Sequence, residues 1–486
     1  MSKSRVTKSP IRPAAGIKPA LQEKSRKRRE THKVLAALEQ PPQLRQRNDL
    51  APTIHIEYLP TASLRPATRR VRRSETAQVA RIERSVKQFG VCIPVLIDRN
   101  RQIIHGHVVW QAAVRLGVEE IPTVKIDHLS KSAQRALAIA LNRTAETGSW
   151  DIEALKIEFE ELIELDEDVI STGFELAEID ALLIEDASAA SADDSVPIVP
   201  QAPVSRPGDL WLCGEHRITQ GDARDPTVYE CLFAETPPAR LVLTDPPFNV
   251  PVLGHCTSQA HHREFAMAHG ELTRDEFAAF NREWIRSALP HLIDGGLLAT
   301  YIDWRSVELI LATGRELDLE LLNIVVWAKS NAGQGSLWRS QHELLPIFKK
   351  GTDPHTNNVG LGRLGRNRSN LWSYAGATTL GSDAREGLSV HPTVKPCAML
   401  EDAILDVTSR GEVVLDCFLG SGSTLIAAET TGRICRAVEL DLGYIDAAVE
   451  RWQRAAGAEA ILNETNETFA EVSLRRRSPT SDEEVR

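Results

Sequence analysis

The stretch EVVLDCFLGSGSTLIAAE, Glu412 to Glu429, decides the fold. Its apolar run Val413–Asp416 predicts a buried strand, and the residues from Ser423 onward predict a helix. Between them, Gly420 and Gly422 let backbone amides approach a ligand at the amino end of that helix. A strand that passes through a glycine turn into a helix is the repeating unit of open α/β sheets, so we expect such a sheet here.

A carboxylate follows this turn at a distance typical of cofactor sites. The next stretch, RICRAVEL, predicts a second strand that ends at Glu439, roughly 20 residues after the glycines. A carboxylate at that strand tip is placed to accept hydrogen bonds from ribose hydroxyls. The turn lacks the GxGxxG spacing of dinucleotide-binding folds, so the pattern indicates a different cofactor with a ribose.

A second strand tip carries an unusual loop. In LVLTDPPFNV, Leu241 to Val250, the apolar run stops at Asp245 and continues as Pro246, Pro247 and Phe248. Two prolines neither continue a paired strand nor enter a helix interior, so we expect the carboxylate on a rigid, irregular loop. An ordinary turn after a strand is the alternative for these four residues alone.

Composition narrows the class of protein. The 486 residues are enough for two or three domains, and no apolar run approaches the roughly 20 residues that span a bilayer. Seven cysteines lack CxxC pairs or metal-like spacing, which fits a reduced cytosol and argues against a structural zinc. The basic N-terminus has no apolar core after it, so it is no secretory signal. We expect a cytoplasmic protein without a membrane segment.

The net charge of −10 is unevenly distributed along the chain. Basic residues gather in the first 50 positions, and acids far outnumber bases from Asp151 to Asp186, where apolar residues recur at helical spacing. An Ala-, Ser- and Pro-rich stretch follows. The predicted parts are a basic disordered tail at 1–50, a compact domain at 51–128, an acidic helical extension at 129–186, a linker at 187–207, an α/β domain at 208–455 and a C-terminal tail at 456–486.

The compact domain resembles the N-terminal α+β domain of ParB-type partition proteins. The resemblance rests on Gly90–Pro94, IIHGHVVWQAA and LGVEEIPTVKI. In that family an acid and two arginines follow the glycine and hold a nucleotide triphosphate. Here Gly106 is followed by His107, Val108 and Val109. We therefore predict no nucleotide hydrolysis by this domain.

The α/β domain resembles the beta group of amino DNA methyltransferases, in which the catalytic motif precedes the cofactor motif. The stretches TDPPF and FLGSGS carry this resemblance, and HRITQGDAR, HPTVKP and the later strands agree with it over nearly all of 208–455. It implies a Rossmann-like sheet with helices on both faces and S-adenosylmethionine as cofactor. The implied cofactor-binding residues are Asp222, His391, Thr393, Lys395, Asp416, Phe418, Gly420, Gly422, Ser423 and Glu439; the implied catalytic residues are Asp245, Pro246, Pro247 and Phe248.

The Asp-Pro-Pro-Phe loop suits the chemistry of a base amino group, whose lone pair is delocalised into the ring. The Asp245 carboxylate and the Pro246 carbonyl can hold both amino hydrogens and turn the nitrogen toward a methyl donor. Phe248 can stack on a base rotated out of the duplex. Cytosine-5 transfer needs a cysteine nucleophile, but the single Pro-Cys step, at Cys397, starts a predicted helix, where a small buried cysteine is expected.

Two further segments are candidates for contact with DNA. Residues 351–390 combine glycines, arginines and aromatics, which suit phosphate, guanine and stacking contacts; an exposed loop with incidental charge is the alternative. The residues concerned are Arg363, Arg366, Arg368, Trp372 and Tyr374. Residues 250–270 contain His255, His261 and His262, which we assign to a substrate-facing loop and not to a metal site.

The sequence thus predicts an adenine-N6 DNA methyltransferase that acts on duplex DNA with a flipped-out base, binds no metal, and carries a ParB-like domain as found in bacteria and their phages. Asp at the first motif position favours adenine by resemblance, and N4-cytosine transfer is the alternative within the enzyme class. A ParB-like DNA-binding protein with a vestigial methyltransferase domain is the alternative outside it. A restriction partner and a homodimer are left open.

Overall fold

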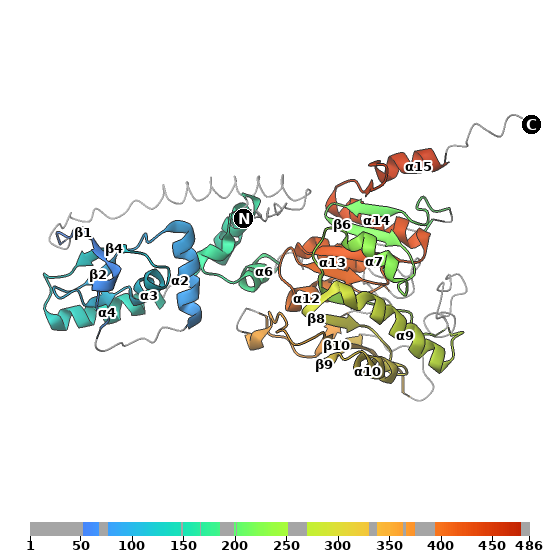
Figure 1. Ribbon diagram of the computed structural model, residues 1–486, viewed down its shortest axis with the longest axis horizontal. Helices are drawn as coiled ribbons and strands as arrows, with labels where there is room; N and C mark the ends of the chain where they lie inside the picture. The colour runs from blue at the N-terminus through green and yellow to red at the C-terminus, as the bar shows by residue number, and fades with distance from the viewer. Residues whose placement is uncertain are drawn as a thin grey trace, which may run out of the picture. The chain divides into compact units, whose positions relative to one another are not determined.

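The computed structural model describes residues 52–67, 76–146, 149–165, 167–184, 199–200, 202–250, 270–329, 338–362, 366–374 and 394–477. These residues divide into two compact units, one ending at Leu182 and the other beginning at Leu183 (Figure 1). The tail predicted at 1–50 lies outside the described residues. None of the described helices is long and apolar enough to cross a bilayer.

The first unit has a four-stranded mixed sheet in the order β1-β4-β2-β3. Its strands are β1 Ile56–Pro60, β2 Val95–Ile97, β3 Ile103–His105 and β4 Glu120–Lys125. Helix α3, His107–Arg115, contributes Ala113 to a small core with Val95, Ile97 and Ile121. The predicted α+β architecture of this domain is confirmed.

The acidic segment forms helices that belong to the same unit. They are α4 Lys131–Glu146, α5 Ile152–Glu164 and α6 Leu176–Ile184, with the short turn η3 Val169–Thr172 between the last two. Helix α5 begins where the Asp151 side chain accepts a hydrogen bond from the Ala154 amide. Glu175 accepts from Arg81 at 3.0 Å and Arg84 at 3.1 Å, both on α2, Thr76–Phe89. These ion pairs tie the segment to the first domain.

The second unit is built on a ten-stranded sheet in the order β11-β9-β10-β8-β7-β12-β13-β6-β5-β14. The run β8-β7-β12-β13-β6 is parallel, and β10, β5 and β14 pair antiparallel. The bounds are β5 Leu210–Cys213, β6 His216–Gln220, β7 Ala239–Thr244, β8 Leu292–Thr300, β9 Glu320–Lys329, β10 His342–Lys349, β11 Leu371–Tyr374, β12 Val413–Asp416, β13 Ile434–Glu439 and β14 Ile461–Leu462. The predicted open α/β sheet is confirmed, including the strands that end at Asp416 and Glu439.

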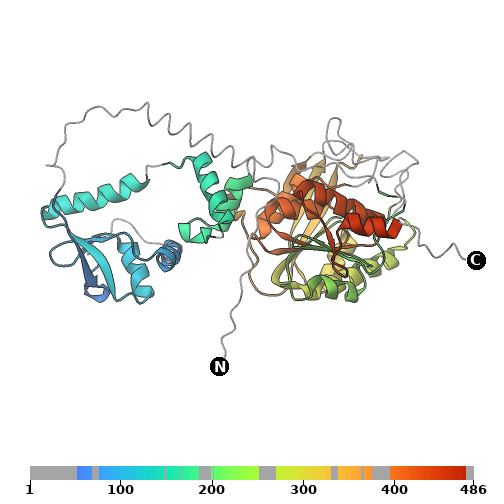
Figure 2. The ribbon, with the colours of Figure 1, turned by 90° about the horizontal axis from the view of Figure 1, so that it is seen from above.

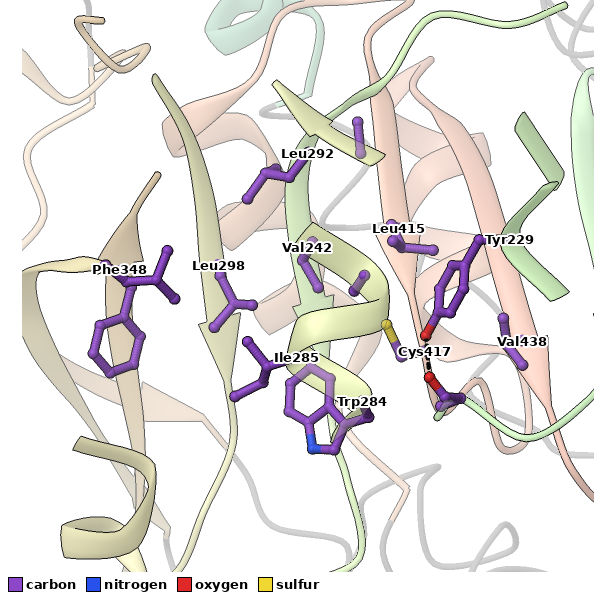
Figure 3. Close-up of a cluster of buried hydrophobic side chains, with 14 of the residues drawn as sticks. Tyr229, Val242, Trp284, Ile285, Leu292, Leu298, Phe348, Leu415, Cys417 and Val438 are labelled. Atoms are coloured by element: carbon purple, nitrogen blue, oxygen red, sulfur yellow. Dashed lines mark hydrogen bonds between the residues drawn. The ribbon is translucent and has the colours of Figure 1, made fainter. Parts of the chain in front are cut away.

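Helices cover both faces of this sheet, as predicted (Figure 2). Side chains alternate along a strand, so Val242 of β7 packs in one cluster with Trp284 and Leu298 (Figure 3). Leu241 and Leu243 lie in the cluster of the opposite face. The helices of the first face are α7 Pro226–Phe233, α9 Arg274–Ala288 and α10 Val307–Glu316; those of the second are α12 Cys397–Val407, α13 Ser423–Thr431 and α14 Leu442–Ala456.

The second unit extends beyond both of its predicted boundaries. Val204 and Ser205, assigned to the linker from composition, are buried, and their amides donate to the Asp446 carboxylate of α14. Beyond position 455, strand β14 pairs with β5, and helix α15, Phe469–Arg477, buries Phe469 in the core around Trp211. The predicted 187–207 linker and 456–486 tail are therefore wrong at these positions. The added elements are too short for a clear hydrophobic period.

The strand order places two loops side by side. Strand β12, late in the chain, pairs in parallel with β7, with Val414 opposite Leu241. The chain continues from β7 to β8 on one side and from β12 to β13 on the other. The carboxyl ends of β7 and β12 therefore flank a topological switch point, where open α/β sheets have their crevice.

Candidate active site

The Asp-Pro-Pro-Phe loop and the glycine loop are tied together at their roots. The Thr244 hydroxyl, at the end of β7, donates to Asp416 Oδ1, at the end of β12, over 2.7 Å. The amide of Cys417 donates back to Thr244 Oγ1 at 3.2 Å, and the amide of Phe418 donates to Asp416 Oδ1 at 3.0 Å. Burial raises the pKa of Asp416 despite these hydrogen bonds. Asp416 is therefore a structural link between the two loops.

One pocket is lined by both loops. The predicted site residues on its wall are Asp245, Pro246, Pro247, Phe248, Lys395, Asp416, Phe418, Gly420, Ser423 and Glu439. Tyr301, Asp441 and Tyr444 line it as well. Sequence segments more than 190 positions apart thus contribute to a single site, as the resemblance implied.

Asp245 has one engaged and one open oxygen. Its Oδ2 accepts from the ammonium of Lys395, whereas its Oδ1 is buried and has no hydrogen-bond partner among the described residues. Burial raises the pKa of Asp245 to about 6, although Lys395 opposes the shift. A buried acceptor without a partner costs free energy, so this oxygen is suited to a donor from a ligand.

Asn249 connects the described residues on either side of positions 251–269. It has a φ of 56°, in the left-handed region that asparagine tolerates better than most residues. Its Oδ1 accepts from the amides of Gly270 at 3.0 Å and Leu272 at 3.2 Å, and its Nδ2 donates to the Leu272 carbonyl at 2.8 Å. Asn249 therefore joins the two ends of the 251–269 segment, and the predicted substrate-facing histidines lie inside that segment, outside the described residues.

Lys395 lines the pocket and is itself buried. Its ammonium also lies 3.4 Å from Glu343 Oε2 of β10. The same ammonium is 5.0 Å from the ring centre of Tyr301, 5.7 Å from that of Phe248 and 5.9 Å from that of Trp327. Burial lowers the pKa of Lys395, but Asp245 and Glu343 outweigh it, and the pKa lies above its usual value.

Sequence reasoning missed Glu343, Tyr301 and Trp327. Each lies at the same edge of the sheet as Asp245, because Tyr301 follows the end of β8 and Glu343 pairs with Trp327 across β10 and β9. The one signal in the sequence is the acid in HELLPIFK, which is out of place in an otherwise apolar strand. Tyr301 Oη and Glu343 Oε2 are buried, without a hydrogen-bond partner in the described part of the chain.

The glycine loop has the geometry of a ligand cradle. Gly422 caps α13 with φ 86°, and a side chain there would bring a Cβ within 2.9 Å of the Ala448 Cβ. Glu439 closes the loop: its Oε2 accepts from the Gly420 amide and its Oε1 from the Asp441 amide, both at 2.8 Å. Burial raises the pKa of Glu439 to about 7, against these two hydrogen bonds.

Two predicted cofactor residues have internal partners. Asp222, after β6, forms a two-pronged ion pair with Arg224, with contacts of 3.0 Å to Nε and 2.6 Å to Nη2, while its neighbours Gly221 and Ala223 line the pocket. Ser423 Oγ accepts from the buried Arg451 at 3.1 Å. Arg451 therefore anchors the end of the glycine loop at Ser423.

Cys397 begins α12 and is 1% exposed, which confirms the expected small buried cysteine. Phe418 contributes to the core as well as to the pocket, because its ring packs edge-on against Trp284 at 5.6 Å. His391 and Thr393 lie outside the described residues. Among the residues that are described, no group of His, Cys, Asp and Glu has the arrangement of a metal site.

Two of the arginines that are candidates for contact with DNA form ion pairs within the protein. Arg366 pairs with Asp402 at 2.7 Å and Asp406 at 2.8 Å, and Arg368 pairs with the same two carboxylates at 2.6 and 2.8 Å. Both guanidinium groups thus hold their segment against α12, and DNA contact by this segment stays a prediction. Arg363 lies outside the described residues.

The charges of the pocket suit a cationic ligand. Four carboxylates line it, those of Asp245, Asp416, Glu439 and Asp441, against the single ammonium of Lys395 on its described wall. The open Asp245 Oδ1 adds an acceptor at the end of the pocket away from Glu439. The arrangement can hold a positively charged ribose compound on the glycine loop and an amino group at Asp245.

Three family models match the chain. Residues 239–450 match the model described as DNA methylase, residues 153–207 that of the ParB-methyltransferase HTH domain, and residues 45–143 that of the ParB N-terminal domain. The second match covers most of the predicted acidic extension and the whole predicted linker, which were separated by composition alone.

Curated relatives are type II methyltransferases. M.HpaI of Haemophilus parainfluenzae is 23% identical over 225 residues, 43% of this chain and 67% of the relative. M2.MboI of Moraxella bovis is 27% identical over 181 residues, 36% of this chain and 64% of the relative. The chain spans about two thirds of the length of these relatives. Among solved structures, a complex of M1.HpyAVI with SAM is 20% identical with a TM-score of 0.36, over 48% of this chain and 97% of that one.

Proposed function

Because residues 239–450 belong to the DNA methylase family and the residues before them match ParB-type domains, we propose that this protein transfers a methyl group from S-adenosylmethionine to the N6 amino group of adenine in DNA. The observation that carries the proposal is the open Asp245 Oδ1, buried where the carboxyl ends of β7 and β12 meet. An acceptor in that position, beside a cradle for a cationic ribose compound, fits methyl transfer to an amine.

The pocket residues fit S-adenosylmethionine. Glu439 is placed for the ribose hydroxyls, and the backbone of the loop from Phe418 to Ser423 lies against the same pocket. The carboxylates of Asp245 and Asp416 suit a positively charged sulfur. When bound, this cofactor supplies an electrophilic methyl group on a cationic sulfur. Asp222 is engaged by Arg224, and its neighbours Gly221 and Ala223 line the pocket at this position.

Asp245 orients the amino group. Its carboxylate accepts one amino hydrogen and the Pro246 carbonyl accepts the other, so the nitrogen lone pair points toward the methyl carbon. The bound cofactor would supply the methyl group to this nitrogen and keep the bonding electron pair on its sulfur, and the amine would then give up one proton. Asp245, with a pKa of about 6, is the nearest base for that proton. The proline pair keeps this geometry fixed before the substrate arrives.

The target base must leave the duplex to reach this pocket, which is lined by residues at the carboxyl ends of β7, β12 and β13. The rings of Phe248 and Tyr301 line the pocket near the ammonium of Lys395, and a planar base can stack on them. We propose duplex DNA with a flipped-out base as the substrate. Asp245 favours adenine by resemblance, and the same two acceptors would also hold the N4 amino group of cytosine.

The test is a nucleoside analysis of DNA from a host that lacks its own adenine and amino-cytosine methylases. Expression of the parent chain should produce N6-methyladenine, detected by mass spectrometry after digestion. Expression of Asp245→Ala at equal level is the matched control and should produce none. N4-methylcytosine in place of N6-methyladenine would establish the alternative substrate. If the protein is soluble and binds S-adenosylmethionine but neither methylated base is found, the alternative of a ParB-like protein with a vestigial methyltransferase domain would be supported.

A further inference from the structure

A row of alternating charges begins at the candidate catalytic carboxylate. Asp245 contacts Lys395, Lys395 contacts Glu343, and Glu343 Oε1 accepts from the ammonium of Lys329. Lys395 is 6% exposed and Glu343 14%. Two acids and two lysines balance each other, which is how a protein keeps charges in a buried position.

The Lys395 ammonium limits what the Asp245 carboxylate can do for an incoming amine. It engages Oδ2 and leaves Oδ1 open to accept an amino hydrogen, but the ion pair stabilises the ionised carboxylate and so weakens it as an acceptor and as a base. The ammonium also lies 5.7 Å from the ring centre of Phe248 and 5.0 Å from that of Tyr301, two rings that line the pocket where a base would stack. A shift of the ammonium toward another acceptor would strengthen the carboxylate in both roles.

Glu343 is the acceptor in reach. Its Oε2 lies 3.4 Å from the Lys395 ammonium, and it has no hydrogen-bond partner among the described residues. A small movement of the lysine end would turn this contact into a hydrogen bond and would weaken the bond to Asp245. Glu343 stays in place during that movement, because Lys329 holds its other oxygen and its strand pairs on both sides.

We propose that Glu343 is a positioning residue for the transfer, which draws Lys395 off Asp245 when the target amino group enters. The proposal rests on the proposed function, since it names how that site admits its substrate. Glu343 does not touch the reacting atoms. It acts through Lys395, and its effect is on the state of the Asp245 carboxylate.

The charged groups around Asp245 give the sign of the expected pH effect. Lys395 faces it from the segment before α12, Glu343 from β10 and Asp416 from β12, with Tyr301 at the end of β8. Burial raises the pKa of Asp245 most, Lys395 lowers it, and Glu343 and Asp416 raise it. Transfer needs the ionised carboxylate, so activity falls as the pH drops through this pKa. Removing the charge of Glu343 therefore lowers the pKa and moves the acid limb to lower pH.

The experiment uses Glu343→Gln in the full chain. We expect kcat for methyl transfer to fall about tenfold or more, the acid limb of the pH profile to move to lower pH, and S-adenosylmethionine affinity to stay unchanged. The matched control is Glu412→Gln, which removes an acid from an ion pair with Arg240, 3.1 Å, at the opposite end of β7 and β12. The control should keep the parent kcat and pH profile.

A double variant separates positioning from simple structural support. In Glu343→Gln, we expect kcat to fall because the Lys395 ammonium stays paired with Asp245. Adding Lys395→Met removes this ammonium, so kcat of the double variant at pH 8 should exceed that of Glu343→Gln. If the two losses simply add, or if Glu343→Gln has the parent kcat and acid limb, the proposal is wrong. Loss of folded protein is detected by the cofactor titration, and Glu343→Asp then replaces Gln, with the same expected rescue by Lys395→Met.

A measurement that does not depend on methyl transfer separates this inference from the proposed function. The carboxyl carbon of Asp245, assigned in ¹³C NMR spectra by comparison with Asp245→Asn, should titrate at lower pH in Glu343→Gln than in the parent. If this shift occurs but the parent methylates no DNA, the coupling stands and the proposed function fails. If DNA is methylated and Asp245 titrates identically in both proteins, the role of Glu343 fails alone.

Discussion

Gly106 in the first unit and Gly422 in the second have nearly the same backbone. Each caps the amino end of a helix after a strand, with φ 94° and ψ 20° at Gly106 and φ 86° and ψ 21° at Gly422. A Cβ added at Gly106 would lie 3.3 Å from a methyl group of Val95, and one added at Gly422 would lie 2.9 Å from the Cβ of Ala448. By backbone alone, both turns place the amino end of a helix where an anion or a ligand could approach.

The side chains around the two turns differ. Gly106 is followed by His107, whose Nε2 accepts from the Ala67 amide at 3.2 Å, and then by Val108 and Val109. Around Gly422, buried carboxylates close the loop, with Glu439 on the Gly420 amide. A glycine turn therefore provides a place for a ligand, and the charges placed around it by other strands decide whether one is bound.

The largest expected effect is the loss of methyl transfer in Asp245→Ala, which tests whether the reaction takes place in the second unit. Asp245→Ala removes the open acceptor and leaves the glycine loop intact, so methyl transfer should fall by about 10²–10⁴-fold, with little change in cofactor affinity. His107→Ala, at the turn of the first unit, should leave the transfer rate unchanged. Tritiated-methyl transfer to duplex DNA, measured beside a cofactor titration, checks both. Transfer at the parent rate by Asp245→Ala would show that the Asp-Pro-Pro-Phe loop is not the catalytic centre.

Glu439→Ala should weaken S-adenosylmethionine binding by about 10–100-fold, the scale of a hydrogen bond to a charged group. Its carboxylate holds two loop amides, so the loss includes some order of the loop as well as the contact to the ribose. Saturating cofactor should restore part of the transfer rate. Calorimetric titration measures the affinity, and a variant that binds normally but transfers slowly would reverse the proposed roles of Glu439 and Asp245.

The two glycines allow a direct comparison at equal backbone strain. Gly106→Ala and Gly422→Ala each force an L-residue into the left-handed region, at a cost of about 1–3 kcal/mol of stability. The added Cβ at Gly422 would also press on Ala448, whereas at Gly106 the nearest atom is Val95 Cγ2 at 3.3 Å. Thermal unfolding should show a loss for both. Cofactor affinity should fall only in Gly422→Ala, and an equal fall in Gly106→Ala would connect the first unit to cofactor binding.

Local signals in the sequence predicted the tips of β7, β12 and β13, because prolines, glycines and a terminal acid mark them. The pairing of Asp245 with Lys395 had no such signal, since the two residues are 150 positions apart and meet only through the strand order. Glu343 depends on β10 running antiparallel between β8 and β9. Arg366 and Arg368 were predicted to contact DNA because no local signal shows that Asp402 and Asp406, 34 to 40 positions further along the chain, lie beside them in the fold.

At the Gly106 turn of the first unit, we expect no nucleotide hydrolysis. A triphosphate needs several positive charges, and the positions after Gly106 provide a histidine and two valines. The histidine is half-buried, and its Nε2 is engaged by the Ala67 amide. Full-length protein should therefore hydrolyse neither CTP nor ATP above a heat-denatured control, with or without duplex DNA, in a phosphate-release assay.

Nucleotide turnover that survives Asp245→Ala and disappears in Gly106→Ala would place a nucleotide site in the first unit. The glycine backbone would then suffice for phosphate binding without the flanking charges, and the contrast between the two turns would not explain their functions.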